Sequence, residues 1–282
     1  MNQIRVRPTV REALASQVCL TSSESPQLDC QILLGHVLQQ SRTWLMAHDD
    51  YQLADQEAEV FIKLVNERSK GNPIAYIIGR QEFWSMEFQV NDATLIPRPD
   101  TELLVETILD RCNRNTATVV DLGTGAGPIA IALARERPDY TIFATDKTYD
   151  TLNVAQQNGR QLQHPNLFFV QADWLTTFKN GVFDIIVSNP PYIEPGDMHL
   201  DQLGFEPTCA LISDENGLKD IRLIVSTAAD YLKPGGMILL EHGYNQQTQV
   251  IDLLHTNDFC NVEPLMDLAG QPRAVLAYKN CN

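Results

Sequence analysis

Four consecutive residues, Asn189-Pro190-Pro191-Tyr192, combine groups that could bind and activate a planar amide or amine. The Asn189 side chain and the Pro190 backbone each offer a carbonyl acceptor, and the two prolines restrict the backbone that carries them. Two fixed acceptors suit the two hydrogens of an NH2 group, while Tyr192 offers a flat wall for stacking. We therefore predict Asn189, Pro190 and Tyr192 as catalytic residues, and these three with Pro191 as the substrate site.

A glycine-rich loop precedes this motif and has the composition of a nucleotide-binding turn. It leaves an apolar strand and opens a helix, where backbone N–H groups can hold a cofactor. The loop lacks the final glycine of a GxGxxG motif, and a carboxylate at Asp121 would repel a pyrophosphate but suit a cationic group such as an ammonium. The predicted cofactor-binding residues of this segment are Asp121, Gly123, Thr124, Gly125, Ala126 and Gly127.

Two further expected strand ends carry side chains that suit a nucleoside. Asp146 ends the next strand, where an acidic residue usually accepts hydrogen bonds from ribose hydroxyls. Asp173 and Trp174 follow the strand after that, and they offer an acceptor for an amino group and an aromatic face for adenine. Because ligands bind at the carboxyl ends of parallel strands, we expect these residues and Asn189 to border one cofactor site.

Together the two groups of residues predict methyl transfer from S-adenosylmethionine to a planar nitrogen, with S-adenosylhomocysteine as the product. The sulfonium is already a good leaving group, so alignment and electrostatics matter more than a strong base. His242, at a later strand end, is interpreted as structural. The six cysteines form no CxxC pair and no His lies at zinc-ligand spacing from them, so no metal site is predicted.

The elements that must position these residues alternate between strand and helix from about residue 100 onward. Continuous apolar runs predict strands covered on both faces, and their alternation with helices predicts an α/β fold with a parallel sheet. The expected strands are 117–122, 141–145, 167–171, 183–188 and 237–241, and the expected helices are 101–111, 128–137, 151–161 and 218–232.

The chain before residue 97 has a different character. Apolar residues at helical spacing, and a Ser25-Pro26 start signal, predict a helical domain over residues 1–70 that could dock a partner. Residues 71–96 contain glycine, proline and aromatic residues and are predicted to form a hairpin linker. Residues 97–282 are predicted to be the catalytic domain.

The charge of the chain limits its partners. Its 282 residues carry a formal net charge of −15, which opposes binding to nucleic acid and to anionic membranes. No apolar run approaches the ~20 residues of a membrane span, and no secretory signal is visible near Met1. We expect a cytoplasmic protein with reduced thiols and with neither nucleic acid nor membrane as its partner.

Longer motifs resemble the HemK/PrmC family of peptide chain release factor glutamine N5-methyltransferases. The resemblance lies in residues 71–84 (GNPIAYIIGRQEFW) and 95–102 (LIPRPDTE), together with the Asp121–Gly127 loop and the Asn189–Tyr192 motif. It covers nearly the whole chain, and the PRPDTE segment is much more specific than Asn-Pro-Pro-Tyr alone.

The resemblance implies a Rossmann-like, seven-stranded class I methyltransferase domain with a small N-terminal helical bundle and a β-hairpin linker. It also implies that the substrate is the glutamine of the Gly-Gly-Gln motif in bacterial class 1 release factors, so that release factors 1 and 2 are the protein partners. By motif match, Gly123 to Gly127, Asp146, Trp174 and Asn189 bind the cofactor. The chain departs from the family pattern in two places. The 193–205 segment is slightly short, and Gln271-Pro272 stands where the family pattern has a different polar pair.

Three other functions share part of this pattern. A DNA adenine N6-methyltransferase would use the same Asn-Pro-Pro-Tyr chemistry, but it normally flips a base and presents a basic DNA surface. A Rossmann dehydrogenase would need a pyrophosphate beside Asp121, which is unfavourable. A non-catalytic binding module would bind no cofactor, so titrations with S-adenosylmethionine and NAD would separate the three.

Overall fold

The computed structural model describes residues 7–21, 23–162 and 165–280, and the chain divides into two compact units between Arg80 and Gln81. This division differs from the predicted boundaries at residues 70 and 96. Helix α5 (Ile74–Ile78) packs against helices of the first unit, because Ile74, Ile77 and Ile78 contact its hydrophobic core. The hairpin of β1 (Arg80–Phe83) and β2 (Met86–Gln89) instead contributes Phe83 and Phe88 to a core of the second unit.

The first unit is helical, as the spacing of its apolar residues predicts. Its elements besides α5 are α1 (Val10–Leu14), the 3-10 helix η1 (Ala15–Cys19), α2 (Pro26–Leu38), α3 (Arg42–Ala47) and α4 (Asp55–Ser69). Leu33, Leu34 and Phe61 are fully buried between α2 and α4. Helix α2 begins at the predicted Pro26, although the Ser25 side chain makes no capping hydrogen bond.

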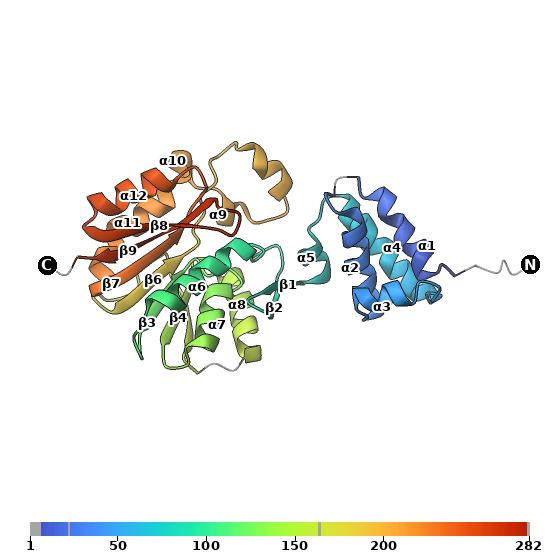
Figure 1. The fold of residues 1–282 in the computed structure, drawn as a ribbon, viewed down its shortest axis with the longest axis horizontal. Helices are drawn as coiled ribbons and strands as arrows, with labels where there is room; N and C mark the ends of the chain where they lie inside the picture. Colours follow the sequence, from blue (N-terminus) through green and yellow to red (C-terminus); the bar gives the residue numbers. More distant parts are fainter. Residues whose placement is uncertain (1–6, 22, 163–164, 281–282) are drawn as a thin grey trace, which may run out of the picture. The chain divides into compact units, whose positions relative to one another are not determined.

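The second unit contains a seven-stranded sheet, which confirms the predicted α/β class (Figure 1). The strand order is β5-β4-β3-β6-β7-β9-β8. The strands are β3 (Thr118–Leu122), β4 (Thr141–Asp146), β5 (Leu167–Gln171), β6 (Phe183–Ser188), β7 (Leu232–Glu241), β8 (Phe259–Met266) and β9 (Pro272–Lys279). The first five pair in parallel, whereas β9 pairs antiparallel with both β7 and β8.

Helices cover both faces of this sheet, and consecutive strand residues point to opposite faces. Val119 belongs to a core with α6 and α7, and Val120 belongs to a second core with α11 and α12. The main helices are α6 (Glu102–Arg111), α7 (Pro128–Glu136), α8 (Tyr149–Leu162), α11 (Lys219–Tyr231) and α12 (Gln247–Thr256). Shorter elements are the 3-10 helices η2 (Pro99–Thr101) and η3 (Met198–Leu203), and the helices α9 (Thr208–Leu211) and α10 (Asp214–Gly217).

The order of strands places the two predicted motifs beside each other. The chain runs from β3 outward through β4 to β5 and then returns to place β6 on the other side of β3. In the β3–β6 register Leu122 is the partner of Ser188, so the loops that begin at Gly123 and Asn189 start next to each other. Such a switch point, at the carboxyl ends of parallel strands, is where α/β folds bind ligands.

No helix within the described part of the chain is both long enough and apolar enough to cross a membrane.

Candidate active site

A cavity of about 490 Å³ lies at this switch point, within the range typical of small-molecule sites. Six of the predicted site residues that could meet a cofactor line it: Gly123, Gly125, Asp146, Asp173, Trp174 and Asn189. They come from the carboxyl end of β4 and from the loops after β3, β5 and β6, as expected from the sequence. Asp121, Thr124, Ala126 and Gly127 are not among the lining residues.

The glycine loop takes backbone conformations that favour glycine at three positions. Gly123, Gly125 and Gly127 have φ values of +67°, +59° and +88°. A Cβ atom at Gly127 would lie 2.9 Å from Cδ1 of Ile131 and 3.3 Å from Cβ of Ala155, whereas one at Gly125 would meet no heavy atom within 4 Å. The absence of a side chain at Gly127 therefore permits close packing against Ile131 and Ala155 under the loop. The absence of one at Gly125 leaves its backbone accessible from the cavity.

Asp121 lies underneath the loop, where it was expected to face a cationic ligand group. Its carboxylate is fully buried, and its Oδ2 accepts hydrogen bonds from Thr124 Oγ1 at 2.6 Å and from the Ala130 backbone N–H at 3.3 Å. Its Oδ1 has no partner among the described residues, and burial raises the pKa of Asp121 to about 7. In the structure Asp121 thus holds the turn between β3 and α7.

Asp146 contributes both to the loop and to the cavity. Its Oδ2 accepts a hydrogen bond from the Gly125 N–H at 3.2 Å, and its Oδ1 accepts one from the Thr148 N–H at 3.0 Å. Burial raises the pKa of this carboxyl group, although the three backbone N–H groups around it, including that of Lys147, act in the opposite direction. Each oxygen keeps a lone pair for a further donor, as a ribose diol would supply.

Asp173 and Trp174 also line the cavity, but their exposure to solvent differs. Asp173 is exposed and forms an ion pair with Lys147 at 3.0 Å. Trp174 is half-buried with a φ of +51°, and its ring lies over Gly123, where an added Cβ would be 3.5 Å from its Cζ3 atom. The conformation is uncommon for a bulky residue, and it directs the indole along the cavity wall.

Asn189 lies between this cavity and a smaller one of about 80 Å³. The smaller cavity is lined by Pro190 and Tyr192, which were predicted to bind the substrate, and by Leu95 and Arg98 from the segment before η2. Pro191, also predicted at the substrate site, lines the larger cavity instead. Asn189 is therefore placed to contact the occupants of both cavities.

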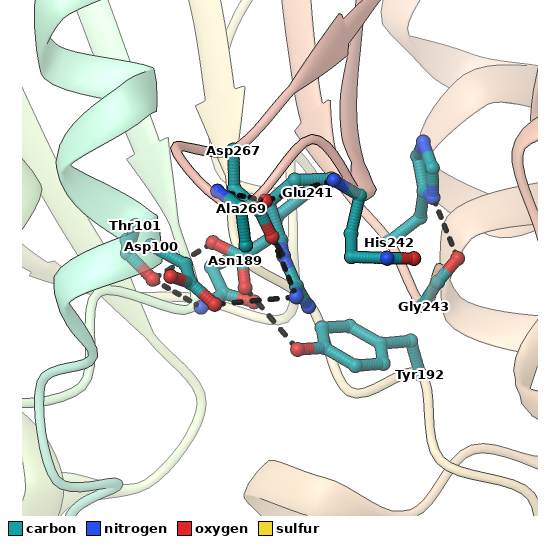
Figure 2. Close-up of polar contacts among 11 residues, drawn as sticks. Asp100, Thr101, Asn189, Tyr192, Glu241, His242, Gly243, Asp267 and Ala269 are labelled. Atoms are coloured by element: carbon teal, nitrogen blue, oxygen red, sulfur yellow. Dashed lines mark hydrogen bonds and ion pairs between the residues drawn. The ribbon is translucent and has the colours of Figure 1, made fainter. Parts of the chain in front are cut away.

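A chain of hydrogen bonds connects the Asn189 side chain to a buried carboxylate (Figure 2). Asn189 Nδ2 donates to Thr101 Oγ1 at 3.1 Å, and Thr101 Oγ1 donates to Glu241 Oε2 at 2.7 Å. The Tyr192 hydroxyl donates to Glu241 Oε1 at 3.2 Å. Asn189 and Tyr192, two residues of one motif, are thus attached to the same carboxylate.

Glu241 is 1% exposed, and burial raises its pKa to about 7. The positive charge of Arg273 partly offsets this effect, while Asp100 adds to it. Arg273 is itself held by Asp267 at 3.0 Å and Asp100 at 3.2 Å. Burial beside Glu241 also raises the pKa of the Tyr192 hydroxyl, so Tyr192 remains a hydrogen-bond donor at neutral pH.

His242 takes no part in this arrangement. Its ring points away from Asn189 and Glu241 in Figure 2, and its Nδ1 pairs with the Gly243 carbonyl oxygen at 2.8 Å. Its Nε2 is buried without a partner among the described residues, and burial lowers the pKa of the imidazole. These contacts agree with the structural role that the sequence analysis gave it.

Thr101, Glu241 and Arg98 are site residues that the sequence analysis did not select. Each lies in a segment that it did quote, Thr101 and Arg98 in PRPDTE and Glu241 at the end of an apolar strand. A buried residue on another loop, Glu206, holds the first of these segments, because it pairs with Arg98 and accepts a hydrogen bond from the Ile96 N–H at 3.1 Å. The signal that could have identified Glu241 is a polar residue at the end of an otherwise apolar strand.

No metal centre is formed by the part of the chain that the structure describes, where no three His, Cys, Asp or Glu residues are placed to hold an ion. The five cysteines within that part are free thiols, and Cys281 lies outside it.

Comparisons with known proteins match both parts of the chain. Residues 13–79 match the family described as PrmC N-terminal domain, and residues 98–203 match the family described as Methyltransferase small domain. A protein of Salmonella typhimurium named release factor glutamine methyltransferase is 43% identical over 256 residues, which cover 90% of this chain and 92% of that protein. The protein of the same name from Escherichia coli is 41% identical over 269 residues, or 95% of this chain and 96% of its own.

Solved structures with low sequence identity share the fold. A methyltransferase from Pyrococcus furiosus superposes with a TM-score of 0.54 at 16% identity, covering 70% of this chain and 90% of that one. A ribosomal protein L11 methylase from Lactobacillus delbrueckii subsp. bulgaricus gives a TM-score of 0.52 at 18% identity, covering 71% and 90%.

Proposed function

The chain belongs to the release factor glutamine methyltransferase family, and on that premise we propose that it methylates the side-chain amide nitrogen (N5) of a protein glutamine. The methyl donor is S-adenosylmethionine. The substrate is the glutamine of the Gly-Gly-Gln motif in bacterial class 1 release factors 1 and 2. The observation that carries the proposal is the position of Asn189 between a nucleoside-sized cavity and a cavity the size of a small side chain.

The residues around the larger cavity fit S-adenosylmethionine. Gly125 leaves open space where any other residue would place a side chain, and Asp146 keeps acceptor capacity for ribose hydroxyls. Trp174 offers an aromatic face to the adenine. When bound, S-adenosylmethionine supplies an electrophilic methyl group on a sulfonium that is a good leaving group.

The residues around the smaller cavity act on the glutamine amide. We assign to the Asn189 side-chain oxygen and the Pro190 carbonyl oxygen the two N–H groups of the substrate amide, which orients its nitrogen toward the larger cavity. Drawing on both hydrogens increases electron density on a nitrogen whose lone pair is otherwise delocalised into the carbonyl group. Alignment and electrostatic preorganisation then account for the catalysis. Tyr192 provides the wall against which the amide plane lies.

No strong base is needed for this reaction. An amide nitrogen that gains a methyl group becomes very acidic, so its proton can pass to water or to Asn189. The buried His242, which points away from the site, is not used as a base.

The proposal is tested by incubating the purified protein with S-adenosylmethionine and a purified class 1 release factor, followed by peptide mass spectrometry. We expect one methyl group on the glutamine of the Gly-Gly-Gln motif, and none on a release factor in which that glutamine is replaced by alanine. Duplex DNA serves as a competing acceptor. Methyl transfer to DNA with none to the release factor would reject the proposal in favour of adenine methylation.

A further inference from the structure

We propose that Thr101 and Glu241 are positioning residues that set which way round the Asn189 side-chain amide is held. The inference rests on the proposed function and deepens it, because it concerns how the amide that meets the substrate is oriented. Thr101 reaches the site from η2, Glu241 from the end of β7 and Asn189 from the loop after β6.

The orientation of an asparagine amide decides what it offers to a substrate. Its NH2 group and its oxygen have nearly the same size, so packing alone distinguishes them poorly. Only the orientation that presents the oxygen gives Asn189 an acceptor for a substrate N–H group. The reverse orientation would set an NH2 donor against the NH2 of the glutamine, and the two would repel.

The hydroxyl of Thr101 selects between these orientations because it has a single proton. That proton is donated to Glu241 Oε2 at 2.7 Å, which leaves the hydroxyl oxygen as an acceptor toward Asn189. Asn189 Nδ2 lies 3.1 Å from that oxygen, so the NH2 group is the end that can bind there. The oxygen of the amide then points away from Thr101.

Glu241 gives the chain of hydrogen bonds its direction. Above its pKa the Glu241 carboxylate is ionised and only accepts hydrogen bonds, and it accepts one from Thr101 and one from the Tyr192 hydroxyl. The same carboxylate therefore holds both the amide that meets the substrate and the ring beside it. Burying a carboxylate at 1% exposure is costly, and apolar residues of similar volume would pack the same space at a lower cost.

The test uses Thr101→Val, which keeps the shape of the side chain but removes its donor and its acceptor. At pH 8, where Glu241 is ionised, and at saturating S-adenosylmethionine and release factor, we expect the single-turnover methylation rate to fall about 10-fold or more, because the transition-state acceptor is misaligned. The dissociation constants of the cofactor and of the release factor should stay within about 3-fold of wild type, because uniform binding is not affected. Thr101→Ser, which restores the hydroxyl, should recover most of the rate.

Two further variants separate positioning from folding. Thr107→Val removes a similarly buried hydroxyl from α6, away from the site, and should leave all three quantities unchanged. Glu241→Gln should slow methylation in the wild-type background. Its added effect on Thr101→Val should be smaller and limited to its separate contact with Tyr192, because Thr101 and Glu241 otherwise act through one chain of hydrogen bonds.

A Thr101→Val rate within about 3-fold of wild type would overturn the inference while leaving the proposed function intact. Equal losses in Thr101→Val and Thr101→Ser would also overturn it, since the hydroxyl would then not be the active feature. A wild-type protein that binds S-adenosylmethionine but methylates no release factor would reject the proposed function and the inference with it.

Discussion

The side-chain nitrogen of Asn189 lies 3.1 Å from the hydroxyl oxygen of Thr101, although 88 residues separate them in the sequence. This hydrogen bond joins the motif after β6 to the turn that opens α6. Because Thr101 in turn donates to Glu241 at the end of β7, three separate segments meet around one side-chain amide.

Replacement of Asn189 by Ala should abolish most catalysis while the release factor still binds. The substrate amide would lose an acceptor, so we expect kcat to fall at least ~100-fold. Single-turnover methylation at saturating cofactor and titration with the release factor measure the two effects. Asn189→Asp should also be impaired, because two carboxylates would compete for the one proton of Thr101. Near-normal methylation by Asn189→Ala would exclude the proposed role of the amide oxygen.

Replacement of Asp146 by Ala should weaken the binding of S-adenosylmethionine. It removes the acceptor proposed for the ribose and frees the Gly125 N–H that Asp146 holds at 3.2 Å. A hydrogen bond to a charged group contributes ~1.5–3 kcal/mol, so we expect the dissociation constant to rise about tenfold or more by calorimetric titration. Asp146→Asn should be milder, and the exposed Asp150→Ala on α8 serves as the control. An unchanged constant in Asp146→Ala would refute the assignment.

Two glycine-to-alanine variants should affect different properties. Gly127→Ala forces a positive φ on alanine and places its Cβ 2.9 Å from Ile131, so the thermal unfolding midpoint should drop clearly. Gly125→Ala carries a backbone cost of about 1–2 kcal/mol but meets no atom within 4 Å, so its main effect should be on cofactor affinity. Equal midpoints for the two variants would contradict the packing described under the loop.

The buried carboxyl group of Glu241 should make stability depend on pH. Its pKa rises from the usual 4.5 to about 7 on folding, so between these values the folded protein binds more protons than the unfolded chain. Stability must then fall as pH rises from about 4.5 to about 7, by at most about 1.4 kcal/mol per pH unit for one group. Glu241→Gln removes this pH-dependent contribution to stability. Thermal midpoints at pH 5, 6, 7 and 8 should show wild type losing stability relative to the variant, and parallel curves would contradict the prediction.

Much of the fold and part of the site follow from local sequence alone. The predicted strand at 183–188 coincides with β6, whose residues are all buried because helices cover both faces of the sheet there. The apolar run at 167–171 coincides with β5, an edge strand that leaves Phe168 46% exposed. Gly123, Gly125 and Asp146 line the cavity as predicted from strand-end positions, since parallel strands bring their carboxyl ends to one edge. The family motifs are likewise short continuous segments that can be read directly.

The tertiary structure alone decided what lies behind those residues. Nothing local indicates that Asp121 turns under its loop to Thr124 and Ala130, because the same residue at a strand end could equally face a ligand. The hydrogen bond between Thr101 and Glu241 joins residues 140 positions apart, and it forms only once the sheet has placed β7 beside β6. Side-chain partners of this kind depend on the pairing of distant strands, which the pattern of a single segment does not contain.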